Sequence, residues 1–248
     1  TGDLTVTAWT GGTIKDAAGG AAAATGTVDL GTVSVDGDAP DLSSVAAADA
    51  TYKIGSSIAI TVTWDEAVVV SGTPTLTLSN SGTASYTSGT GNTALVFTYV
   101  VADGNGDTSS LAVSSYSGTI ADAAGGAAAA ASGDLGDVVI DASSPDITGC
   151  DATDSAYGVG EAISITCTYN EAVTVTGTPT ITLSNNDVAS YASGSGGTDI
   201  VFTTTVAEND ATSADLSVSS IQPTAGGATM KDSNANAVTT TITNGDLG

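Results

Sequence analysis

Apolar and polar residues alternate along most of this chain. The clearest run covers residues 57–65, in which Ile58, Ile60, Val62 and Trp64 alternate with small or hydroxyl-bearing residues. A period of two predicts a β-strand with one buried face, and threonine on the other face favours the same structure. The chain is therefore expected to be built from half-buried strands.

Short alternating segments of this kind are separated by clusters of glycine, asparagine, aspartate and proline, which is typical of an antiparallel β-sandwich. One stretch of the chain predicts seven strands, at residues 43–48, 57–65, 74–79, 83–87, 94–101, 111–116 and 137–141. Seven strands in about 100 residues predict an all-β, immunoglobulin-like Greek-key sandwich. The alanine-rich residues 121–131 are predicted to form a loop, because Gly125 and Gly126 disfavour a helical turn.

The pattern repeats. Residues 52–78 read YKIGSSIAITVTWDEAVVVSGTPTLTL and residues 157–183 read YGVGEAISITCTYNEAVTVTGTPTITL, an offset of 105 positions (157 − 52). The opening DLTVTAWTGGTIKDAAGG is similar to LAVSSYSGTIADAAGG at 111–126, and the closing GDLG matches 133–136. Repeats of this size indicate a modular, extended protein, and the offset ends suggest an excerpt of a longer chain.

Three units follow from this alignment. Residues 1–40 are predicted to be the C-terminal part of a preceding repeat, 41–145 a complete repeat, and 146–248 a repeat that lacks its last strand. The linkers at 36–41 and 141–146 are short and acidic, and each contains a proline that favours extended backbone before it. We therefore expect the sandwiches to stack end to end as a rod.

The repeated motif, Y-x-x-G-x-x-I-x-I-T-x-T-[WY]-[DN]-E-A-V-x-V-x-G-T-P-T-[LI]-T-L with a later [IM]-x-D-A-A-G-G, resembles the bacterial immunoglobulin-like repeats of giant surface and secreted proteins. It is similar to the tandem arrays of large adhesins, including the repeat type of cyanobacterial swimming-motility proteins. The last unit departs from the motif, because its loop reads MKDSNANA and keeps only Asp232 of the D-A-A-G core. The resemblance implies an extracellular stalk or extender at a bacterial cell surface, and it implies no particular ligand.

The chain is strongly acidic. It has 27 acidic residues against three basic ones and no histidine, which gives a formal charge of −24 at pH 7. Phosphate binding needs lysine and arginine, so nucleic acid is not an expected partner, and no apolar stretch is long enough to predict membrane insertion. Without histidine, and with both cysteines expected to pair, the chain is not predicted to be an enzyme. The charge favours cations as partners.

The two cysteines stand at equivalent places in the repeat. Cys150 and Cys167 replace Val45 and Val62 of the preceding unit. Two apolar positions that change together predict a disulfide between neighbouring strands, a bond that persists in oxidising compartments. The alternative, two buried free thiols that pack as small apolar groups, stays open at this point.

The acidic residues fall at predicted poles of the sandwiches. In an immunoglobulin-like unit the loops after the second and sixth strands share the N-terminal pole, so Glu66 and Asp122 are expected to meet there, as Glu171 and Asp232 are in the next unit. The opposite pole carries the run Asp103-Gly104-Asn105-Gly106-Asp107, with oxygen-bearing side chains on alternate residues. Such spacing suits a hard cation.

End-to-end stacking would bring these groups together. Asp103, Asn105 and Asp107 are expected near the linker carboxylates Asp141 and Asp146, facing the acidic loops of the next unit. This arrangement predicts calcium at the joints, where it would offset the repulsion between carboxylates. The simpler interpretation, that the D-G-N-G-D run is only a turn, stays open because aspartate and asparagine side chains bond nearby backbone amides.

A self-assembling filament is the second functional hypothesis. The third unit is predicted to lack a strand, which leaves a sheet edge open to a strand from another copy. Residues 31–36, GTVSVD, correspond to the absent strand and are the expected donor. The expected partners are therefore neighbouring repeats of the same chain or other copies of it.

Overall fold

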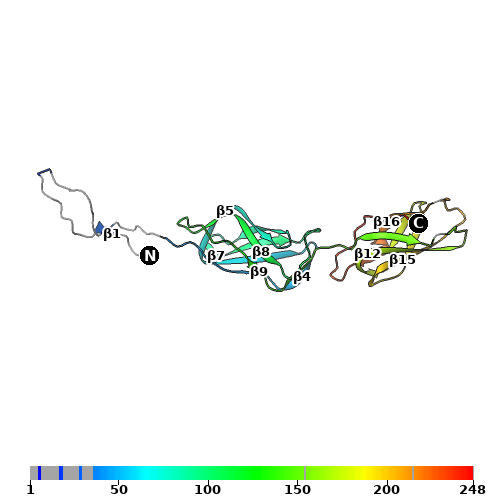
Figure 1. The fold of residues 1–248 in the computed structure, drawn as a ribbon, viewed down its shortest axis with the longest axis horizontal. Coiled ribbons are helices and arrows are strands. Elements are labelled where there is room, and N and C mark those ends of the chain that lie inside the picture. The colour runs from blue at the N-terminus through cyan, green and yellow to red at the C-terminus, as the bar shows by residue number, and fades with distance from the viewer. Residues whose placement is uncertain are drawn as a thin grey trace.

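The computed structural model describes residues 5–6, 17–18, 28–29, 36–153, 155–213 and 215–247. Most of the predicted partial repeat at residues 1–40 lies outside this set, and so does most of the expected donor segment 31–36. The short antiparallel pair of β1 (Thr5–Val6) and β2 (Val28–Asp29) is described. The described chain is almost entirely β, with mostly antiparallel sheets packed around two separate hydrophobic cores, and the all-β prediction is confirmed (Figure 1).

The first sandwich contains eight strands: β3 (Leu42–Ala46), β4 (Ala50–Lys53), β5 (Ser57–Leu78), β6 (Thr83–Ser88), β7 (Asn92–Val100), β8 (Ala112–Ala121), β9 (Gly133–Asp134) and β10 (Val138–Asp141). β5 pairs with β3 and β7 along its first half and with β6 and β8 along its second half. The sequence predicted two strands, at 57–65 and 74–79, where the structure has this single long one. The residues between the two predicted strands remain hydrogen-bonded in the sheet, because β5 passes there from its pairing with β3 and β7 to its pairing with β6 and β8.

The strand β4 was not predicted. Its sequence, ATYK, is short and only half-buried, so the alternation of apolar residues is weak there. It becomes a strand because β10 lies beside it in parallel, with Ile140 opposite Tyr52 and Asp141 opposite Lys53. A partner so distant in sequence supplies hydrogen bonds that local propensity does not reveal.

The second sandwich repeats these pairings with β11 (Ile147–Ala152), β12 (Ala162–Thr176), β13 (Thr180–Leu183), β14 (Val188–Ser193), β15 (Gly197–Thr205), β16 (Val218–Gln222), a 3₁₀ turn η1 (Ala225–Gly227) and β17 (Thr229–Lys231). β12 and β13 together correspond to β5: β12 pairs with β11, β15 and β17, and β13 pairs with β14 and β16. Residues 155–158, the counterpart of β4, form no strand. The described part of the chain holds no counterpart of β10 to pair with them.

Alternate side chains of the two longest strands fill the cores. Trp64 on β5 is 1 % exposed and Tyr169, its counterpart on β12, is 2 % exposed. Full burial of each large apolar side chain contributes about 1.5–3 kcal/mol. The Trp64 Nε1–H also donates to the carbonyl oxygen of Ala129, 3.3 Å away. The Ala129 acceptor belongs to the alanine-rich segment, which forms a loop, as predicted, rather than a helix.

Cys150 and Cys167 are joined by a disulfide between β11 and β12. The two residues are direct cross-strand partners with Cα atoms 4.0 Å apart. Val45 and Val62 are direct partners in the same register between β3 and β5. The disulfide therefore replaces a valine pair at an equivalent place in the other sandwich.

Candidate functional site

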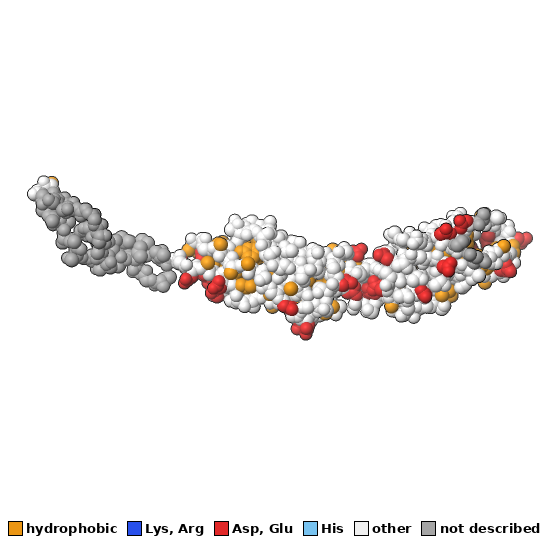
Figure 2. All heavy atoms as spheres, viewed as in Figure 1, with side chains coloured by type: hydrophobic (Ala, Val, Ile, Leu, Met, Phe, Trp, Pro, Cys, Tyr) orange, Lys and Arg blue, Asp and Glu red, His pale blue; other side chains and the backbone are white. Residues whose placement is uncertain are grey.

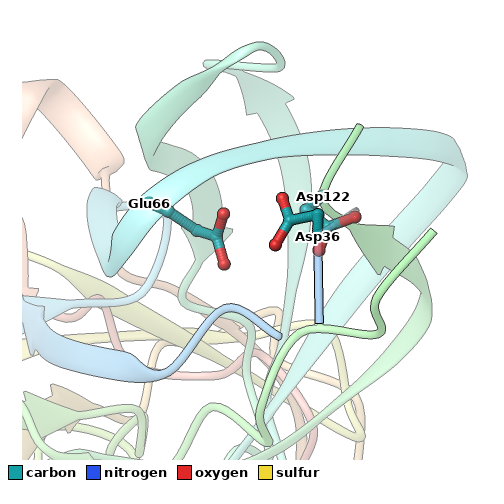
Figure 3. A group of neighbouring side chains, drawn as sticks. All are labelled: Asp36, Glu66 and Asp122. Atoms are coloured by element: carbon teal, nitrogen blue, oxygen red, sulfur yellow. The ribbon is translucent and has the colours of Figure 1, made fainter. Parts of the chain in front are cut away.

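Three carboxylates converge at the N-terminal end of the first sandwich. Asp36 comes from the linker, Glu66 from the middle of β5 and Asp122 from the loop after β8. One oxygen of each lies within 4.8 Å of the others, and Figure 3 shows the Glu66 carboxylate directed toward the other two. Calcium binds oxygen at about 2.3–2.6 Å, so oxygens sharing one ion lie at most about 5 Å apart, and this acidic triad satisfies that limit.

The loop that holds Asp122 explains its position. Asp122 Oδ1 accepts hydrogen bonds from the amides of Gly125 and Gly126 at 2.6 and 2.8 Å, and the Asp122 amide donates to the Gly126 carbonyl at 2.9 Å. Aspartate favours this kind of turn because its side chain bonds its own backbone a few residues on. These hydrogen bonds fix one oxygen of the carboxylate, Asp122 Oδ1, and leave the second oxygen without a bond from the loop amides.

That second oxygen, Asp122 Oδ2, is buried and accepts no hydrogen bond from any described residue. The side chain is only 6 % exposed. A Cβ at Gly126 would lie 2.4 Å from Asp122 Oδ2, so glycine at this position leaves the space beside the oxygen open. A buried carboxylate oxygen without a partner is costly, and a cation is the partner that removes most of that cost.

The electrostatics of the triad point the same way. Partial burial, and then the neighbouring carboxylates of Asp36 and Asp122, raise the pKa of Glu66 above its ordinary value of 4.5. Like charges held close together disfavour the ionised form of each group. A bound cation would reverse that effect.

The equivalent carboxylates of the second sandwich are Asp141, Glu171 and Asp232, and they lie at the joint between the two sandwiches. Figure 2 shows acidic side chains gathered at this joint and at the far end of the first sandwich. Burial, followed by Asp232 and then Asp141, raises the pKa of Glu171. Among the described residues only the first triad brings three such oxygens within 4.8 Å, so the two places are not alike.

Hydrogen bonds cross the joint between the two sandwiches. We call it the second joint, and we call the linker at Asp36, before the first sandwich, the first joint. The Lys53 ammonium donates to the carbonyl of Ala235 at 3.1 Å, and the Ile54 amide donates to Asn236 Oδ1 at 3.0 Å. The Asn236 Nδ2 group donates to Asp141 Oδ1 at 3.1 Å and to Asp232 Oδ2 at 2.8 Å. These contacts hold the end of the first sandwich, the linker and the loop of the second sandwich together.

The predicted D-G-N-G-D segment lies beside the linker and behaves largely as a turn. Asn105 Oδ1 accepts from the Tyr99 hydroxyl at 2.8 Å and from the Ala102 amide at 2.9 Å. Asp107 accepts from the Ala142 amide at 2.7 Å and from the Ser143 hydroxyl at 2.9 Å, and so fastens the linker.

The remaining predicted ligands have other surroundings. Asp103 is exposed. Asp146 accepts a short hydrogen bond from the Thr239 hydroxyl, and its amide donates to Asn170 Oδ1 at 2.8 Å. The structure therefore gives the Asp146 carboxylate one protein donor of its own, the Thr239 hydroxyl, and calcium binding at either residue stays a prediction from the sequence.

Sequence reasoning missed two contributors. Asp36 was placed in the linker but was not predicted as a ligand, although it aligns with the predicted ligand Asp141 at the same offset of 105 positions (141 − 36). Asn236 was also missed, although it belongs to the MKDSNANA loop, the segment in which the last unit departs from the motif. Its role depends on where its amide points, which the sequence does not specify.

A groove of about 730 Å³ opens at the other end of the second sandwich, and its apolar lining includes Tyr157, Ile163, Val206, Leu216 and Leu247. The first four correspond to Tyr52, Ile58, Val101 and Leu111, which belong to the hydrophobic core of the first sandwich, as Val138 and Ile140 of β10 also do. Two of these counterparts bind β10 directly in the first sandwich: Tyr52 pairs with Ile140, and the Leu111 amide donates to the Val138 carbonyl at 2.9 Å.

No family model, curated protein or solved structure matches this chain. Within the described residues, no helix has the length and apolar character needed to span a bilayer.

Proposed function

We propose that this chain is an extracellular structural repeat region, the stalk or extender of a large bacterial surface protein, and that calcium stiffens it. The observation that carries the proposal is the second joint, where Lys53 and Ile54 of one sandwich bond Ala235 and Asn236 of the other. Fixed hydrogen bonds keep two sandwiches in one relative orientation, which an extender requires. The immunoglobulin-like character and the bacterial surface are inferred from the repeated motif.

The proposed calcium site is the triad of Asp36, Glu66 and Asp122. Three carboxylate oxygens within 4.8 Å of one another offer a hard divalent cation a set of charged ligands. Water would complete the coordination, since Glu66 is not fully buried. A cation there would fasten the linker at Asp36 to the sandwich and so restrict bending at its N-terminal end.

Small-angle X-ray scattering of the full chain tests the extender role. We expect the distance distribution of two sandwiches in line, unchanged by dilution. In chelator, Lys53→Ala combined with Asn236→Ala should broaden that distribution, because the bonds across the second joint are lost. Asn92→Ala, at the first residue of β7, where the Asn92 side chain donates to the Gly89 carbonyl within the first sandwich, is the matched control and should leave the distribution unchanged. Two sandwiches folded back on each other would contradict the proposal.

The groove of the second sandwich favours a second candidate function, assembly by strand donation. Its occupant would be residues 31–36 of another copy, which correspond in sequence to residues 136–141, the segment that includes β10. The counterpart positions hold β10 in parallel beside β4, so the donor is expected to run parallel to residues 155–158. In strand addition, backbone hydrogen bonds supply affinity, and pockets that receive alternate side chains of the added strand supply specificity.

A peptide experiment tests strand donation. The peptide GTVSVD, flanked by its natural neighbours, should raise the melting temperature of the second sandwich, and a scrambled peptide should not. Light scattering should then show concentration-dependent polymers that excess peptide suppresses. A chain that stays monomeric at high concentration and ignores the peptide would contradict this function and leave the extender proposal intact.

A further inference from the structure

We propose that only the first joint needs a cation. At the Asp36–Glu66–Asp122 triad a cation bridges the carboxylates, whereas at the second joint the side-chain amide of Asn236 does so. This inference rests on the proposed binding of calcium at the first triad. It deepens that proposal by assigning the cation to one joint and an amide to the other.

The two loops are built alike, so the comparison is between equivalent atoms. The Gly126 amide donates to Asp122 Oδ1 at 2.8 Å, and the Asn236 amide donates to Asp232 Oδ1 at 2.9 Å. Each aspartate amide returns a bond to the carbonyl of the same partner, at 2.9 Å in the first loop and 3.0 Å in the second. Gly126 and Asn236 therefore occupy one structural position, and the second loop adds a side chain there.

That side chain reaches the oxygen that is left without a partner in the first loop. Asp232 Oδ2 accepts from Asn236 Nδ2 at 2.8 Å, whereas Asp122 Oδ2 accepts no hydrogen bond from the described residues. Both aspartates are buried to a similar degree, 5 % exposed for Asp232 and 6 % for Asp122. The difference is thus in the partner of the oxygen and not in its exposure.

The same amide also reaches the linker carboxylate. Asn236 Nδ2 donates to Asp141 Oδ1 at 3.1 Å, and Asn234 Nδ2 donates to Asp141 Oδ2. Asp141 corresponds to Asp36 of the first triad. One amide group therefore bridges the two carboxylates that a cation would bridge at the first joint, and it donates hydrogen bonds where the cation would supply charge.

Asn236 is also fixed from its other side, because its Oδ1 accepts from the Ile54 amide of the preceding sandwich. The side chain is 3 % exposed. A cation at the second joint would have to displace an amide that already makes bonds to both sandwiches and to the linker. At the first triad, Gly126 offers no side chain to compete with the ion.

The consequence is a rod with two kinds of joint. Removal of calcium should loosen the joint at Asp36 and leave the joint at Asn236 closed. The chemical class of the ligand at the first triad is a hard divalent cation with oxygen coordination, and calcium is the probe used below.

Isothermal titration of the chelator-treated full chain with calcium chloride tests the inference by counting sites. We expect one site in the unaltered chain and none in Asp122→Asn. Asn236→Gly, which installs the residue found at the equivalent position 126, should raise the count to two. Asn236→Gly combined with Asp122→Asn should return it to one. Asn236→Asp is a second route to the extra site, and circular dichroism checks that each variant is folded.

The possible failures are distinguishable. Two sites in the unaltered chain, or one site in both Asn236 variants with none in Asp122→Asn, would overturn the inference while calcium binding at the first triad stands. Absence of calcium binding in every folded form would overturn the proposed calcium function together with the inference.

Discussion

Asn236 donates a hydrogen bond from its side-chain amide to the carboxylate of Asp141, 3.1 Å away, across the joint between the two sandwiches. Asp141 lies at the end of β10 and of the first sandwich, whereas Asn236 belongs to a loop of the second. The chain carries a formal charge of −24, and a carboxylate that is removed from water at the joint needs a hydrogen-bond donor or a cation. The amide supplies the donor here.

The disulfide should stabilise the second sandwich, and the fold of this sandwich should not depend on it. Cys150→Val combined with Cys167→Val installs the valine pair that the first sandwich carries in the same register. The bond closes a loop of sequence separation 17, and its loss should cost about 3 kcal/mol through the larger entropy of the unfolded chain. Urea denaturation of the double variant measures this loss. Loss of the strand signal in circular dichroism without denaturant would contradict the expectation.

The hydroxyl of Tyr169 is buried and accepts or donates no hydrogen bond among the described residues. Burial raises the pKa of Tyr169 well above its ordinary value of 10.0. Tyr169→Phe removes an unsatisfied polar group and keeps the ring, so stability should stay the same or rise by about 1 kcal/mol. Denaturant unfolding measures the change. The comparison variant is Trp64→Phe, which loses the bond to Ala129 and should destabilise the first sandwich.

Stability should depend on pH through Glu66 and Glu171, whose pKa values are raised above 4.5 by burial and by nearby carboxylates. A carboxyl with a raised pKa binds its proton more tightly in the folded state. Its contribution is fully present below the unfolded pKa and is lost as the pH rises through the folded pKa. In chelator, the melting temperature should therefore fall as the pH rises above the ordinary value of 4.5 and through the higher folded pKa of these glutamates.

Two tests accompany this pH profile. Glu66→Gln should reduce the decrease of the melting temperature with pH. In the unaltered chain, calcium should reduce this decrease more than the substitution does. Asp134 has the opposite sign, because the backbone of Gly136 and the Ser110 hydroxyl lower its pKa below 3.8, so its stabilisation is lost only as the pH falls through that lower value. A melting temperature that rises with pH above the ordinary glutamate value of 4.5 in chelator would contradict the assignment.

The strands with clear alternation could be predicted from sequence because burial of one face decides their structure. β4 could not, because Ala50–Lys53 becomes a strand only through β10, which lies far away in sequence. The meeting of Glu66 with Asp122 followed from the order of strands and loops. The contribution of Asn236 did not, because it depends on the direction of one side-chain amide within a loop that departs from the repeated motif.

The most direct test of the central claim is thermal unfolding of the full chain in millimolar calcium and in excess chelator. Asp122→Asn is the test variant, and Asp151→Asn, at an exposed position, is the control that loses the same charge. A cation at 100 times its Kd adds about 2.7 kcal/mol to stability. We predict a rise of roughly 10 °C or more with calcium in the unaltered chain and in Asp151→Asn, and no rise in Asp122→Asn. An equal rise in all three, or none in the unaltered chain, would contradict a calcium-clamped joint at Asp122.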